Sequence, residues 1–173
     1  MTVVAGGAPT TAEESLPEIS LNREAAELVR AGDISTLREK LEVVHDNFLA
    51  DPLAGTADVN DGVPASDLAV MSDPTWQIVF TATVREALRP GPDGWADETL
   101  ALLGDWADVD CSTVETSLTW WHAPADADAP LSAARRLLRK IPQAALRLFD
   151  DDEGHLAAFH RESGILDELL ARG

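Results

Sequence analysis

Cysteine is nearly absent from this chain of 173 residues, which contains Cys111 alone. One cysteine can form no disulfide within the chain, and Cys111 has no C-x-x-C neighbour that would indicate a zinc or redox site. We interpret Cys111 as a small, partly buried side chain. Because sparing use of cysteine suits the reducing cytosol, we predict a cytoplasmic protein.

Long hydrophobic runs are also absent. No run approaches the roughly 20 apolar residues that are needed to span a bilayer. The opening residues 1–15 have no basic segment ahead of a hydrophobic stretch, as signal peptides do. We therefore expect a mature chain with no membrane association.

Basic residues are few, since 13 lysines and arginines stand against 31 aspartates and glutamates, for a net charge of -18. The phosphates of nucleic acids require a positive surface, so this charge excludes nucleic acid as a partner. Lysine is the rarer of the two bases, at Lys40 and Lys140 alone. A surface poor in lysine and rich in aspartate favours solubility in concentrated salt.

Motifs for nucleotides and for calcium are missing too. Gly6 and Gly7 follow a short β-branched run, but neither G-x-G-x-x-G nor G-x-x-x-x-G-K-[ST] is present. The polar segment 51–62 holds several aspartates without the spacing and closing glutamate of an EF-hand. We expect no cofactor and no metal ion.

The first two thirds of the chain contain mainly helical patterns. A β-branched strand is predicted over residues 2–5, and a helix from Ser20, its cap, to Gly32. Asp33 or Ser35 caps the next helix, and Pro74 opens a later one. The helix after Asp33 carries one apolar stripe with helical spacing, made of Leu37, Leu41, Val44 and Phe48.

The last third alternates strands and helices. Apolar strands are predicted over 118–121 and 145–149, with a helix over 131–140 between them and a final helix capped by Ser163. Such alternation predicts parallel strands joined by right-handed helical crossovers. A chain of this length is expected to form one domain.

A polar loop follows each of these two strands, at the place where functional groups gather in open parallel sheets. Loop 122–130 carries Asp126 and Asp128, and loop 150–155 is an acidic run, expected to be solvated, that ends in His155. An acid and a histidine at adjacent strand ends can hydrogen-bond, and the acid then fixes the imidazole tautomer. We interpret the other histidines as structural or surface residues: His45, His122 and His160.

Residues 121–156, WHAPADADAPLSAARRLLRKIPQAALRLFDDDEGHL, resemble the C-terminal half of α/β-hydrolase-fold enzymes, the superfamily of esterases, lipases, epoxide hydrolases and proline-directed peptidases. The likeness runs from a strand through an acid loop, a helix ending in Ile-Pro and a second strand to a GEGH-like turn. It implies that Asp126 is the acid and His155 the base of a Ser-His-Asp triad, with Pro130 as the proline after the acid. Asp128 is the alternative acid if the loop is shifted.

The resemblance extends more weakly over most of the chain. VVAGGAP, residues 3–9, is similar to a core strand and turn, and DGWADETLALLGDW, residues 93–106, to the return from a cap to the core. The implied fold class is α/β: the C-terminal portion of an α/β-hydrolase fold, with about three parallel strands, flanking helices and an α-helical cap. Its parts are the first strand and turn over 1–12, the helical cap over 13–94 and the C-terminal α/β segment over 95–173.

The nucleophile elbow of that family, G-x-S-x-G, does not occur in these 173 residues and would have to precede Met1. The resemblance implies acyl transfer from a small ester or amide to water, with the serine supplied by a complementary N-terminal half and little activity without it. The open edge of strand 2–5 could instead mediate self-association. The competing hypothesis is a hydrolase relic that acts as a non-catalytic binding or assembly module.

Overall fold

The computed structural model describes residues 1–4, 6–8, 20–56, 62–104, 106 and 109–171. The chain forms two compact units, which we describe separately. The sheet unit comprises residues 1–15, 63–70 and 105–173, and the helical unit comprises residues 16–62 and 71–104. Within the described part, no helix has the length and apolar character that crossing a membrane requires.

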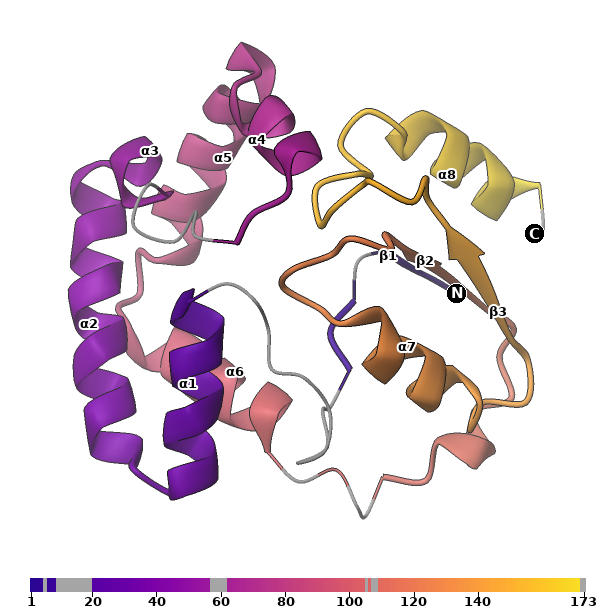
Figure 1. The fold of residues 1–173 in the computed structure, drawn as a ribbon, viewed down its shortest axis with the longest axis horizontal. Helices are drawn as coiled ribbons and strands as arrows, with labels where there is room; N and C mark the ends of the chain where they lie inside the picture. The colour runs from indigo at the N-terminus through magenta and orange to yellow at the C-terminus, as the bar shows by residue number, and fades with distance from the viewer. Residues whose placement is uncertain (5, 9–19, 57–61, 105, 107–108, 172–173) are drawn as a thin grey trace. The chain divides into compact units, whose positions relative to one another are not determined.

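The sheet unit contains three parallel strands in the order β1-β2-β3, as predicted (Figure 1). They are β1 (Thr2–Val4), β2 (Leu118–His122) and β3 (Ala144–Leu148). Val3 pairs with Trp120, and Trp120 pairs with Leu146 on its other side. Since β2 lies between two neighbours, four of its five residues are buried, which explains its continuous apolar pattern.

Helices α7 (Leu131–Leu138) and α8 (Glu162–Leu170) pack on opposite faces of this sheet. Alternate side chains of a strand point to opposite faces, so Trp120 joins the core under α7. Trp121 packs instead against the cluster that contains Ile165 of α8. The helix predicted over 131–140 ends earlier, at Leu138, because Pro142 disfavours helical backbone just before it.

The predicted cap of the last helix is wrong. Ser163 lies inside the first turn of α8, and Arg161 occupies the N-cap position without a side-chain cap. The N–H of Ile165 donates to the carbonyl oxygen of Arg161, which is the first intrahelical bond. The helix therefore begins at Glu162, whose negative charge suits a helix N-terminus.

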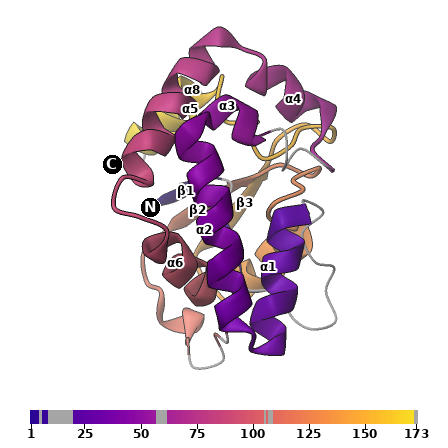
Figure 2. The ribbon, with the colours of Figure 1, turned by 90° about the vertical axis from the view of Figure 1, so that its left-hand side faces the viewer.

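The helical unit is built from α1 (Ser20–Ala31), α2 (Ile34–Ala50), α3 (Pro52–Gly55), α5 (Pro74–Ala87) and α6 (Asp93–Leu103) (Figure 2). Helix α1 is followed by Gly32, whose positive φ of 72° favours glycine. The side chain of Ser20, its predicted cap, lies outside the described residues. Helix α6 was not predicted as a helix.

Two aspartates start the longer helices of this unit. The carboxylate of Asp33 accepts a hydrogen bond from the N–H of Thr36 at the start of α2, as predicted. The carboxylate of Asp73 accepts from two N–H groups ahead of α5, where Pro74 is the first residue. Of the predicted stripe on α2, Val44 is half-buried and three residues are fully buried: Leu37, Leu41 and Phe48.

Candidate active site

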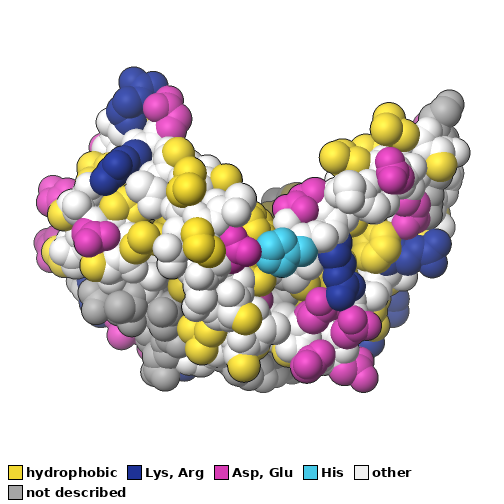
Figure 3. All heavy atoms as spheres, turned by 90° about the horizontal axis from the view of Figure 1, so that it is seen from above, with side chains coloured by type: hydrophobic (Ala, Val, Ile, Leu, Met, Phe, Trp, Pro, Cys, Tyr) yellow, Lys and Arg dark blue, Asp and Glu magenta, His cyan; other side chains and the backbone are white. Residues whose placement is uncertain are grey.

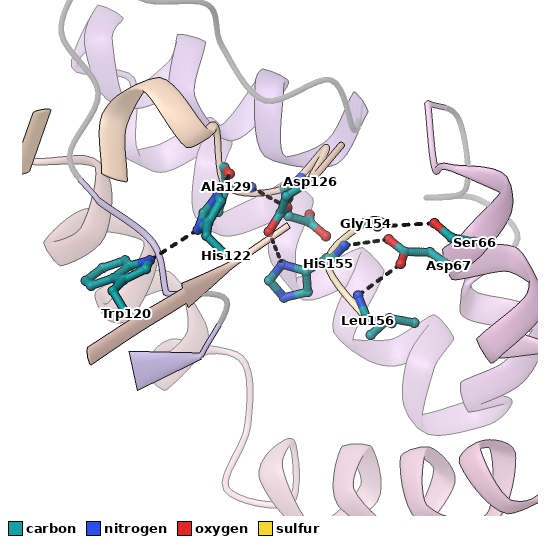
Figure 4. A network of polar contacts seen from close by, with 10 residues as sticks. Ser66, Asp67, Trp120, His122, Asp126, Ala129, Gly154, His155 and Leu156 are labelled. Atoms are coloured by element: carbon teal, nitrogen blue, oxygen red, sulfur yellow. Dashed lines mark hydrogen bonds and ion pairs between the residues drawn. The ribbon is translucent and has the colours of Figure 1, made fainter. Parts of the chain in front are cut away.

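The loop after β2 presents a buried carboxylate, that of Asp126, whose side chain has no exposed area. Its Oδ1 atom accepts hydrogen bonds from the backbone N–H groups of Asp128, at 2.9 Å, and Ala129, at 2.8 Å. These two bonds fix the plane of the carboxylate, and its second oxygen, Oδ2, lies 3.0 Å from Nδ1 of His155 (Figure 4).

His155 lies in the loop after β3, so the acid and the histidine come from adjacent parallel strands. The Asp126 carboxylate only accepts hydrogen bonds, so Nδ1 of His155 carries the proton and donates it. In the neutral ring Nε2 then has a free lone pair, which is the position from which a histidine acts as a base. The side chain is 35% exposed.

The charge on His155 is governed by its acidic surroundings. Burial alone would lower its pKa, but the hydrogen bond to Asp126 and the negative charges of Asp126, Asp128 and Asp67 outweigh this effect. Together they raise the pKa of His155 from 6.5 to about 9. The imidazolium form is therefore stabilised, as it must be in any step where this ring takes a proton.

Asp128, the alternative acid, has a different place in the loop. Its backbone N–H donates to Asp126, and its charge adds to the field around His155. Asp126, Asp128 and His155 each bring one potential ligand atom within 4.8 Å of the others. Both oxygens of Asp126 already accept hydrogen bonds, however, so we interpret the cluster as an acid–histidine pair and not as a metal site.

A second buried aspartate, Asp67, supports the loop of His155 and was missed in the sequence. It lies on α4 (Ala65–Met71), which was not predicted as a helix. Its carboxylate accepts the backbone N–H groups of His155, at 2.8 Å, and Leu156, at 3.0 Å. No local pattern marks this residue, because 88 positions of sequence separate Asp67 from His155.

His122, at the end of β2, is fully buried and supports the acid loop. Its Nδ1 accepts from Nε1–H of Trp120 at 3.2 Å, so Nε2 carries the proton and lies 2.8 Å from the carbonyl oxygen of Ala129. Burial lowers the pKa of His122. The ring is thus a neutral structural link between β2 and the loop that holds Asp126.

In the acidic run 150–153 the three aspartates are exposed, as expected, and Glu153 is half-buried. Arg161 donates to Asp150 at 3.1 Å and to Glu153 at 2.6 Å, and its guanidinium lies over the ring of Phe149. Glu153 also accepts the N–H of Asp150, closing the turn ahead of His155. Acidic, basic and hydrophobic side chains are interspersed on the face that Figure 3 shows, where histidine also reaches the surface.

Comparison with solved structures identifies the fold of this chain. No family model matches the chain, and no curated protein matches it. Among solved structures, an esterase from Exiguobacterium antarcticum aligns with a TM-score of 0.50 at 13% identity, over 78% of this chain and 47% of the esterase. An α/β hydrolase from a Medee basin deep-sea metagenome library aligns at 12% identity and a TM-score of 0.44, over 99% of this chain and 54% of that one.

A 2-hydroxy-6-oxo-6-phenylhexa-2,4-dienoate hydrolase from Rhodococcus sp. also aligns, at 16% identity and a TM-score of 0.43, over 98% of this chain and 53% of the hydrolase. The chain thus spans about half the length of these structures. The similarity to the esterase identifies the fold of this chain, and that fold agrees with the three-stranded parallel sheet. The chain has the fold of the C-terminal half of an α/β hydrolase, as the sequence predicted.

Proposed function

We propose that this chain supplies the acid and the base of a Ser-His-Asp hydrolase that transfers an acyl group from an ester or amide to water. One observation carries the proposal: Asp126 and His155 meet at 3.0 Å beyond the ends of adjacent parallel strands, so that in the neutral form of His155 the Nε2 atom can accept a proton. The α/β-hydrolase fold supports it as an analogy of architecture.

In the proposed reaction, a serine outside these 173 residues attacks the substrate carbonyl while its hydroxyl proton moves to Nε2 of His155. The resulting imidazolium is stabilised by Asp126, which stays ionised. His155 then gives the proton to the leaving alkoxide or amine as the tetrahedral intermediate collapses. Water repeats the sequence on the acyl-serine, with His155 again taking and returning one proton, and releases the acid.

The serine half is the partner that this proposal requires, because no G-x-S-x-G elbow occurs in these 173 residues. It could belong to a longer form of this chain or to a second polypeptide. Within the described residues, β1 pairs with β2 on one side and is the edge of the sheet. We propose that strands of the serine half add at this edge; self-association there is the alternative.

We propose that the helical unit acts as a substrate-binding cap, the role predicted for residues 13–94. It contains a cavity of about 430 Å³. Phe48, Phe80 and Trp95 lie at its wall with edge-to-face contacts between the rings, and Glu98 contributes a carboxylate. Such a lining suits an apolar group of a small substrate. The low cysteine content supports a cytoplasmic location.

A second candidate is a hydrolase relic that acts as a binding or assembly module. Such a module would need no nucleophile, and no nucleophile motif occurs in these 173 residues. The net charge of -18 of this chain would then favour binding to a basic or salt-adapted partner. The two candidates differ in whether a serine half exists for this chain, which the DNA upstream of the codon for Met1 would reveal.

The decisive experiment mixes or fuses this chain with the polypeptide encoded upstream that carries G-x-S-x-G, and measures hydrolysis of a short-chain aryl ester. We expect activity in the combination and only a trace in the chain alone. Asp126→Asn should lower kcat by about 10⁴-fold and His155→Ala by about 10⁶-fold, as loss of the triad acid and base does.

The matched control is Asp152→Asn, which removes an exposed carboxylate from the same loop and should leave the rate unchanged. Activity that survives both triad substitutions would contradict the proposal. An upstream frame without the motif, together with no activity in the combination, would favour the binding module.

A further inference from the structure

Three consecutive backbone N–H groups of the His155 loop are bound by two consecutive residues of α4. The hydroxyl of Ser66 accepts from Gly154 at 3.1 Å, and the carboxylate of Asp67 accepts from His155 and Leu156 (Figure 4). Asp67 is only 4% exposed, so it lies in the sheet unit as a buried acceptor and not as a surface charge. Hydrogen bonds to a charged acceptor are among the stronger ones in proteins.

We propose that Asp67 is a positioning residue, which holds the backbone of His155 in the place from which its ring reaches both Asp126 and the substrate. The proposal rests on the proposed function only in taking His155 as the base. Asp67 itself touches neither substrate nor reacting atoms in this scheme, and acts through the loop.

Gly154 leaves the space that the carboxylate of Asp67 occupies. A Cβ atom on Gly154 would overlap both carboxylate oxygens of Asp67, one of them at 2.7 Å. Since atoms do not approach so closely, only glycine lets the carboxylate reach the two following N–H groups. Gly154 is buried and its φ is not in the positive range that favours glycine, so space and not backbone conformation explains this glycine.

Two anchors therefore fix His155 from opposite ends. Asp67 holds its backbone N–H at 2.8 Å, and Asp126 holds its ring at Nδ1 at 3.0 Å. With both in place, the direction of Nε2 is set before any substrate binds. A displacement of about 1 Å of a catalytic group can cost on the order of 100-fold in rate, which makes such an anchor relevant to catalysis.

Asp67 also belongs to the set of charges that face His155, which comprises Asp126, Asp128 and Asp67. Burial raises the pKa of Asp67, and the bonds from Leu156 and His155 oppose this increase. Where the carboxylate is ionised, its charge favours the imidazolium. Loss of this charge should therefore lower the pKa of His155.

The test uses the 173-residue chain by itself and needs no catalysis. In Asp67→Asn, the amide oxygen can still accept one of the two N–H groups. The amide NH₂ is itself a donor, so it cannot accept the other. We expect hydrogen exchange of the His155 and Leu156 amides to become at least about 10-fold faster, and the imidazole pKa of His155, followed by NMR, to decrease. Asp152→Asn removes the same charge from an exposed position and should leave exchange at both amides unchanged.

Unchanged exchange and unchanged imidazole pKa in folded Asp67→Asn would overturn the proposal. Should that variant not fold, Ser66→Ala removes the acceptor of the Gly154 N–H; faster exchange at Gly154 and His155 then supports an anchor on α4, and unchanged exchange overturns it. A different result would contradict the proposed function. In that case the combined halves would hydrolyse the aryl ester equally well with and without His155→Ala, whatever the exchange rates in the loop.

Discussion

The substitution Asp126→Asn tests the centre of the site with a change of one atom and one charge. The asparagine oxygen can keep both bonds from the N–H groups of Asp128 and Ala129, because these bonds go to a single oxygen, Oδ1. The amide NH₂ then takes the place of Oδ2 and donates to Nδ1 of His155. A ring that accepts at Nδ1 carries its proton on Nε2, which is the wrong tautomer for a base.

The expected change in the pKa of His155 follows from the groups that raise this pKa and the burial that lowers it. Its pKa is about 9 because the hydrogen bond and charge of Asp126, with the charges of Asp128 and Asp67, overcome burial. At pH 7.5 such a ring is mostly protonated. Without Asp126, burial is opposed by the two remaining charges alone, and the pKa should fall to near 6.5 or below. A ring with a pKa of 6.5 is only about 9% protonated at pH 7.5.

The change also alters how stability depends on pH. The pKa of His155 is raised on folding from 6.5 to about 9, so the stability it contributes is fully present below pH 6.5. That contribution is lost as the pH rises through 9. The difference in unfolding free energy between the wild type and Asp126→Asn should therefore shrink from pH 6.5 to pH 9.

The assay is an NMR titration of the imidazole C–H signals of the four histidines, with His155→Gln to assign the relevant one. Asp128→Asn is the matched control, since it removes a charge near His155 but keeps the carboxylate that binds Nδ1. We expect a smaller decrease in that variant. A wild-type pKa near 6.5, or the same pKa in wild type and Asp126→Asn, would refute the reasoning.

Two further predictions concern stability. Gly154→Ala should lower the free energy of unfolding in urea by about 1 to 3 kcal/mol, because the new Cβ overlaps the carboxylate of Asp67. Gly164→Ala in α8, where a Cβ meets nothing within 4 Å, should instead raise it by about 0.5 to 1 kcal/mol; equal effects would contradict the packing argument. His122 is buried and its pKa is lowered. Below pH 6.5 the histidine therefore binds a proton in the unfolded chain but not in the folded chain. The free energy of unfolding then decreases by up to about 1.4 kcal/mol per pH unit. His122→Phe should flatten this slope in thermal melts between pH 6.5 and pH 5, and an unchanged slope would show that other groups cause it.

Local patterns in the sequence were enough to find the strands and the two loops that hold Asp126 and His155. Strand β2 is buried on both faces, so its residues form a continuous apolar run, and its neighbours follow from the alternation with helices. The acid and the histidine then came from the resemblance of residues 121–156 to hydrolases. Each of these signals lies within a short stretch of chain.

The features that were missed depend on contacts that no pattern in the sequence marks. Asp67 meets the His155 loop across 88 residues, and one aspartate on a short helix has no local mark of that contact. Arg161 was expected neither as the partner of Asp150 and Glu153 nor as the first residue before α8. Ser163 is a good cap by composition, but the bond from Ile165 to the Arg161 carbonyl starts the helix two residues earlier.

The position of α4 in the chain has a consequence for how such a protein can vary. Residues 63–70 belong to the sheet unit, while the segments on both sides, 16–62 and 71–104, belong to the helical unit. The helical unit is therefore formed by two segments of the chain, and the short stretch between them carries Ser66 and Asp67, which bind the backbone of the His155 loop. An engineer who varies the helical unit should exchange 16–62 or 71–104 separately, since one deletion across both would also remove Ser66 and Asp67.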